Sequence, residues 1–217
     1  MPIPEELAFL VARFRKVFGS TVTDTYTLNR VYVMAVTEMY RHYGYEEAAR
    51  RLFEWGYVMG HSYMLRLEKD LARFKMDAPT IKLIGRMAWY IFAGNDPETL
   101  IETREEEEGT VFILRVRDPN SPWDAGLKLG KKVAHYPAGA YEAAGNTFAE
   151  IVTGGKWRTF TRNTKSIAAG HPYTELVHIV VPTSMPKERV IELFPEHFEE
   201  ISYDFSDQLY KRFFKHK

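Results

Sequence analysis

Apolar residues recur at helical spacing in the N-terminal part of the chain. Leu7, Leu10 and Phe14 fall on one side of a helix, and Gly19 follows as a stop signal. The same period returns further along, where large aromatic side chains share the apolar positions. The pattern predicts helices in four stretches: 7–18, 28–39, 45–74 and 81–92.

Past residue 97 the period shortens, and runs of apolar residues are bounded by glycine and proline. Four such runs predict strands: 100–106, 110–116, 157–164 and 173–181. In the second run Val111 and Ile113 face one way, whereas Phe112, Leu114 and Val116 face the other. Because both faces are apolar, we expect this strand to be covered on both sides.

Helical patterns separate and follow the strands. The stretch 138–152 is rich in glycine and alanine, so one side of this helix can press against a sheet, and Gly154 ends it. Two further helical pieces are predicted over 186–194 and 195–214. The order of elements predicts an α+β fold, with helices packed on a largely antiparallel sheet.

The chain shows no internal repeat and no linker, so its 217 residues predict a single domain, 1–217. We expect N-terminal helices over 5–92, a sheet with its packed helix over 98–181, and C-terminal helices over 186–214.

Two glycines four residues apart, Gly56 and Gly60, interrupt the predicted helix 45–74. Each glycine costs a helix about 1 kcal/mol relative to alanine, so the pair indicates that a second backbone or a ligand lies close to this side. Close packing of two helices is the more common of these causes.

Composition narrows the possible functions. The 29 basic and 29 acidic side chains balance, so no overall field favours nucleic acid, and we expect no nucleic-acid partner. The chain has no cysteine, which excludes disulfides, cysteine-ligated zinc and thiol nucleophiles. No run of about 18 apolar residues predicts a membrane span, and the first residues lack a signal-peptide pattern. We therefore expect a cytoplasmic protein.

Common catalytic motifs are missing from the sequence. No glycine-rich phosphate loop follows a predicted strand, and none of the seven histidines has a partner at a recognised metal-binding spacing. The sequence thus predicts no catalytic residue, no metal and no cofactor. Aromatic residues make up 14% of the chain. Each one alone is most simply a core residue, but as a set they favour an apolar pocket.

Two segments carry a family resemblance. Residues 135–143 read HYPAGAYEA and residues 163–176 read NTKSIAAGHPYTEL, and the glycine-containing segment 44–60 precedes them. In order and spacing they resemble the 4-vinyl reductase (hydrocarbon-binding) domain family, which shares its fold with subunits of the TRAPP tethering complex. The resemblance implies a domain that holds an apolar molecule between helices and sheet, often as a homodimer.

The sequence departs from the family where many relatives carry cysteines. Those positions are here His135 or Tyr136, Ser166 and Thr174. Hydroxyl and phenol groups are poor zinc ligands, so we expect no such zinc site. The turn at Gly170 must then be held by packing and hydrogen bonds. A residual metal site at His135 and His171 stays an open alternative.

The leading hypothesis is a non-catalytic domain that binds or senses an apolar, aromatic or lipid-like small molecule. Parts of 55–92 and 136–160 would line its pocket. The predicted ligand-binding residues are Trp55, Met59, Tyr63, Trp89, Phe92, Tyr136 and Phe148.

Two alternatives come from other functional classes. One is a TRAPP-like dimeric interaction scaffold with a vestigial cavity. The other is a reductase or hydrolase related to the namesake of the family, with His61, His135 or His171 as the proton donor.

Overall fold

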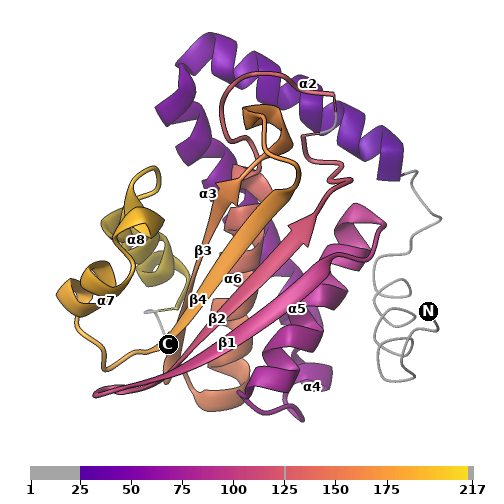
Figure 1. The fold of residues 1–217 in the computed structure, drawn as a ribbon. Helices are drawn as coiled ribbons and strands as arrows, with labels where there is room; N and C mark the ends of the chain where they lie inside the picture. The colour runs from indigo at the N-terminus through magenta and orange to yellow at the C-terminus, as the bar shows by residue number, and fades with distance from the viewer. Residues whose placement is uncertain (1–24, 125, 215–217) are drawn as a thin grey trace.

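Helices and one sheet form the described part of the chain. The computed structural model describes residues 25–124 and 126–214, without the side chains at 25–29, 91 and 92, so the predicted helix 7–18 lies outside it (Figure 1). In chain order the elements are α2 (Thr25–Tyr43), α3 (Tyr45–Arg66), α4 (Glu68–Leu71), α5 (Ala78–Ala93), β1 (Glu98–Glu106), β2 (Gly109–Asp118), α6 (His135–Thr153), β3 (Trp157–Lys165), the 3-10 turn η1 (Ile167–Ala169), β4 (Thr174–Pro182), α7 (Lys187–Leu193), the 3-10 turn η2 (Pro195–Phe198) and α8 (Tyr203–Phe214).

The four strands form one sheet in the order β1-β2-β4-β3, and every neighbouring pair is antiparallel. The α+β fold with an antiparallel sheet is therefore as predicted. The register places Leu114 of β2 beside His178 of β4, and Val180 of β4 beside Thr159 of β3. These four side chains share the helix-facing side of the sheet.

Strand β2 is covered on both faces. Phe112, Leu114 and Val116 belong to the core under the helices, whereas Val111 and Ile113 belong to a second apolar cluster on the opposite face. Helices α3, α5 and α6 lie behind the sheet in Figure 1, α7 contributes Val190 to the cluster on the opposite face, and α8 lies beside the β3 edge, where its Leu209 joins the core under the helices. The predicted double coverage is confirmed.

Glycines join α3 to α6. A Cβ atom at Gly56 would lie 1.9 Å from the Tyr136 carbonyl oxygen, and one at Gly139 would lie 1.9 Å from the Phe53 carbonyl oxygen. A Cβ at Gly60 would meet the Ala140 carbonyl oxygen at 2.1 Å. No side chain fits between these backbones. Close helix packing is thus the reason for the glycine pair.

Local sequence explains both ends of α5, but two breaks were not predicted. One lies over 199–202, where the predicted helical piece 195–214 is interrupted between η2 and α8. The Asp77 side chain accepts a hydrogen bond from the Thr80 amide at 2.9 Å and caps α5, which ends at Gly94 with a φ of 80°. The predicted helix 45–74 instead divides at Leu67, between α3 and α4. No described helix combines the length and apolar character that crossing a bilayer requires.

A buried ion pair fastens α6 to the sheet. Oε2 of Glu142 accepts hydrogen bonds from Nη1 of Arg162 at 2.6 Å and from the Thr161 amide at 2.9 Å. Arg162 also donates to the Ile201 carbonyl oxygen at 3.0 Å and to the Ser206 hydroxyl of α8 at 2.8 Å. Burial lowers the pKa of the Arg162 guanidinium, while the contact with Glu142 opposes that shift. This network fixes the position of α6 on the sheet.

Candidate ligand-binding cavity

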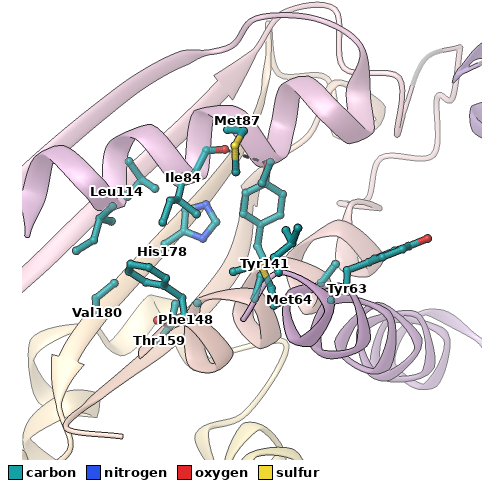
Figure 2. Close-up of a pocket in the computed structure, with 18 of the residues that line it drawn as sticks. Tyr63, Met64, Ile84, Met87, Leu114, Tyr141, Phe148, Thr159, His178 and Val180 are labelled. Carbon is teal, nitrogen blue, oxygen red and sulfur yellow. Dashed lines mark hydrogen bonds between the residues drawn. The ribbon is translucent and has the colours of Figure 1, made fainter. Parts of the chain in front are cut away.

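A cavity of about 80 Å³ lies between α3, α5, α6 and the helix-facing side of the sheet (Figure 2). Its walls are almost entirely apolar. The lining residues are Gly60, Tyr63, Met64, Leu67, Met76, Ile81, Ile84, Gly85, Met87, Ala88, Leu114, Ala140, Tyr141, Ala144, Gly145, Phe148, Thr159, His178 and Val180.

Small residues create this space. The facing helices α5 and α6 place glycine or alanine on the cavity wall at Gly85, Ala88, Ala144 and Gly145, where a larger residue would fill the gap. Three methionines occupy part of the remaining room. Their unbranched thioether chains have several rotatable bonds and adapt to different neighbours, so the volume available to a guest can change. The methionines are Met64, Met76 and Met87.

The lining residues differ in burial between the sheet and the helices. Leu114, His178 and Val180 of the sheet are at most 3% exposed and form the floor. Tyr63 of α3 and Ile84 of α5 are half-buried. Ala88 of α5 and Ala144 and Gly145 of α6 are half-buried as well, so all three helices contribute to the less buried part of the wall.

Two polar atoms on the floor have no hydrogen-bond partner. His178 is held through Nδ1, which lies 2.9 Å from the Thr161 hydroxyl, but its Nε2 is buried and unpaired. The Thr159 hydroxyl is also buried and unpaired. Desolvation lowers the pKa of His178 to about 3, so the imidazole is neutral at neutral pH.

Tyr141 packs beside this histidine. The two ring centroids are 4.9 Å apart, and the Tyr141 hydroxyl donates a hydrogen bond to the Gly85 carbonyl oxygen at 3.2 Å. Burial raises the pKa of the Tyr141 phenol well above its ordinary value. No aspartate, glutamate, lysine or arginine lines the cavity, so a neutral, mostly apolar guest suits it.

Of the residues predicted from the sequence, Tyr63 and Phe148 line the cavity. Trp89 does not: it is completely buried nearby, and its indole nitrogen donates to Oδ2 of Asp118 at 2.8 Å. Trp55 is 56% exposed, because the inward side of α3 is taken by the glycines that contact α6.

The remaining predicted residues lie elsewhere. Tyr136 packs against the rings of Tyr32 and Trp123, with centroids 5.6 and 6.3 Å away. Met59 is half-buried on α3 and is not part of the cavity wall. The side chain of Phe92 lies outside the described residues.

The three histidines considered as proton donors do not line the cavity. Nδ1 of His61 lies 2.9 Å from the Thr147 hydroxyl. His135 is buried with Nε2 3.0 Å from the Lys132 carbonyl oxygen, and desolvation lowers its pKa to about 4. His171 is exposed on a turn. Among the described residues, no group of three or more histidine, aspartate or glutamate side chains is placed to hold a metal ion.

Sequence reasoning missed His178, although a signal was present. It lies between Leu176 and Val180 on the same face of an otherwise apolar strand, and alternation alone places it on the face that carries those two residues.

Hydrogen bonds hold the turn at Gly170. Oδ2 of Asp124 accepts from the Ser166 hydroxyl at 2.6 Å, from the Ile167 amide at 2.8 Å and from the Thr174 hydroxyl. Ser166 and Thr174 occupy two of the positions where the resembled family often has cysteine. Their hydroxyls thus join the turn to the loop that contains Asp124.

No protein-family model matches the sequence, and no curated protein matches it either. Solved structures do. A trafficking protein particle complex subunit 3 from Naegleria fowleri, covalently bound to palmitic acid, is 18% identical, with a TM-score of 0.52 over 73% of this chain and 95% of that one. The phenol-responsive sensory domain of the transcription activator PoxR, with phenol, is 16% identical, with a TM-score of 0.49 over 80% of this chain and 82% of that one. The likeness to the first shows a shared fold.

Proposed function

We propose that this protein binds or senses a small apolar molecule, aromatic or lipid-like, in the cavity between α3, α5, α6 and the sheet. The observation that carries the proposal is an apolar cavity inside the helix-facing core, lined by small residues and methionines. Ligand sites in proteins are typically apolar hollows with a few polar groups, and this cavity has that character.

The volume sets a condition on binding. An engineered cavity of about 150 Å³ accepts benzene, and the present cavity of about 80 Å³ is smaller. A ring or an acyl chain therefore enters only when methionine side chains move aside. The trafficking-complex subunit with the shared fold is covalently bound to palmitic acid, which supports a lipid-like guest. The resemblance to the 4-vinyl reductase domain family points to the same class of ligand.

The side chains that line the cavity favour a binding function over a catalytic one. His178 is the histidine that lines the cavity, and a pKa of about 3 leaves it no proton to donate as an imidazolium at neutral pH. The other ionisable side chains of the wall are the phenols of Tyr63 and Tyr141. We therefore infer no reaction at this site.

The proposal is tested by native mass spectrometry of protein purified without detergent, together with melting shifts on addition of aromatic compounds and lipids. We expect a bound guest or a shift in the wild type. Ala144→Phe, on the cavity wall, should abolish both, whereas Ala72→Phe adds the same ring at an exposed position and should not. If the wild type shows neither guest nor shift, the protein does not have this function.

A homodimeric scaffold is the second candidate function. Val31 and Met34 of α2, one turn apart, are 59% and 69% exposed. Such apolar side chains suit contact with a second copy of the chain. Light scattering distinguishes a dimer from the 25.3 kDa monomer, and Met34→Lys should dissociate a dimer that uses this face.

A further inference from the structure

We infer that the ligand of this cavity is an uncharged molecule with one hydroxyl or carbonyl group on an otherwise apolar frame, and that this group hydrogen-bonds with Nε2 of His178 and the hydroxyl of Thr159. The inference rests on the proposed function and specifies which ligands the cavity prefers.

Neither of these two polar atoms has a hydrogen-bond partner among the described residues. Nε2 of His178 and Oγ1 of Thr159 are buried without a hydrogen bond. Leaving a buried donor or acceptor unpaired costs about 1 to 3 kcal/mol, and native proteins leave few such atoms. The phenol of Tyr141, on the same wall, is paired with the Gly85 carbonyl oxygen. A ligand group is the partner that these two atoms can gain.

The side chains of Thr159 and His178 lie close together on the sheet. Thr159 pairs with Val180 across the sheet and Thr161 pairs with His178, so Thr159 and His178 are diagonal neighbours on adjacent strands. Diagonal neighbours are roughly 7 Å apart at the backbone, which lets one small group reach both side chains. Figure 2 shows the imidazole of His178 between Ile84, Tyr141 and Phe148, within the space enclosed by the helices.

The imidazole ring of His178 is held in one orientation. The bond between Nδ1 of His178 and the Thr161 hydroxyl fixes the ring, so Nε2 has one direction. Nε2 is a donor in one neutral tautomer and an acceptor in the other, and the Thr159 hydroxyl can do both. A ligand hydroxyl suits either tautomer, and a ligand carbonyl suits the one in which Nε2 carries the proton.

The lining of the cavity disfavours both charged ligands and pure hydrocarbons. A carboxylate on this floor would meet no lysine or arginine among the lining residues, and burying an unpaired charge is costly. A ligand without any polar group would leave both protein atoms unpaired. An uncharged ligand with a single polar group avoids both costs.

Three probes of similar size separate these possibilities: benzyl alcohol, ethylbenzene and benzoate. Calorimetry gives the affinity ratio of benzyl alcohol to ethylbenzene for the wild type, Thr159→Val and His178→Phe. Comparing ratios between proteins cancels the different hydration of the probes. We expect the ratio to fall about tenfold in each variant, since one hydrogen bond is lost. Benzoate should bind the wild type more weakly than benzyl alcohol.

The control is Thr147→Val, a buried threonine of α6 outside the cavity wall, which should leave the ratio unchanged. Because the Thr159 hydroxyl has no partner in the protein, Thr159→Val should melt no lower than the wild type. An unchanged ratio in both cavity variants, or benzoate binding as tightly as benzyl alcohol, overturns the inference while the proposed function stands. If no probe binds the wild type, the inference is wrong, whereas the native mass spectra and melting shifts with lipids and other aromatic compounds decide the proposed function separately.

Discussion

Helix α6 makes two contacts that are both built from small residues, and the two differ in what fills the missing volume. Against α3, the space beside Gly139 is occupied by the Phe53 backbone. Against α5 and the sheet, the space beside Gly85 and Gly145 is occupied by side chains, and a cavity remains between the helices. The first contact is sealed and the second is hollow.

The two contacts of α6 differ in how far their neighbours can move. Two backbones in contact cannot move apart locally without shifting whole helices, so the sealed contact fixes the angle between α3 and α6. In the hollow contact the neighbour of Gly85 is the flexible end of Leu114, and three methionines line the cavity beside it; these side chains can take other rotamers. A ligand can be admitted only on that side of the helix.

The largest expected effect comes from breaking the sealed contact. In Gly139→Ala the new Cβ would lie 1.9 Å from the Phe53 carbonyl oxygen, a backbone atom that cannot turn away. We expect a loss of about 3 kcal/mol or more in the free energy of unfolding, measured in urea. Gly145→Ala in the same helix meets the Thr159 side chain instead, and should cost less. A Gly139→Ala protein as stable as the wild type would show that the helix backbones do not touch.

The next largest effect is a loss of stability at low pH, caused by His178 on the sheet side of the cavity. Desolvation lowers the pKa of His178 from 6.5 to about 3, so the unfolded chain takes up a proton below pH 6.5 that the folded chain does not. Stability is therefore unaffected by this group above pH 6.5 and falls as the pH drops towards 3. Between pH 6.5 and pH 5 this histidine should cost about 2 kcal/mol.

His178→Phe isolates that contribution. His135, whose pKa is also lowered by burial, remains in both proteins and cancels from the comparison. The pKa of His197 is lowered first by burial and to a smaller extent by His178, so only that smaller part differs between the two proteins. The loss of unfolding free energy between pH 6.5 and pH 5 should be smaller in the variant by about 2 kcal/mol. Equal losses in the two proteins would mean that His178 is protonated in the folded state.

The sequence predicted the fold better than the site, for a physical reason. Strand alternation and helix stop signals are local, so the two faces of β2 and the end of α5 at Gly94 followed from neighbouring residues. The division of the helix 45–74 at Leu67 has no glycine or proline to mark it. The inward side of α3 was not predicted either. Trp55 was expected to line the pocket, but the glycines occupy the side of α3 that contacts α6, and Trp55 is exposed.

The cavity depends on contacts between segments far apart in the chain. Tyr63, Tyr141 and His178 meet only because α3, α6 and β4 are brought together, and no local pattern gives that arrangement. The aromatic set pointed to a pocket in this part of the fold, and Tyr63 and Phe148 were among the predicted residues. The polar floor was missed, since one histidine in an apolar strand gives no sign of its partners.

The smallest expected effect comes from filling the hollow contact. In Gly85→Ala the new Cβ would lie 2.4 Å from Cδ2 of Leu114, the far end of a side chain that borders the cavity and can rotate into it. Alanine also favours the helix by about 1 kcal/mol over glycine, which offsets the cost of moving Leu114. The unfolding free energy of Gly85→Ala should therefore stay within about 1 kcal/mol of the wild type, measured in the same urea titration. A loss as large as that of Gly139→Ala would mean that both sides of α6 are equally rigid, and an adaptable binding cavity could not lie there.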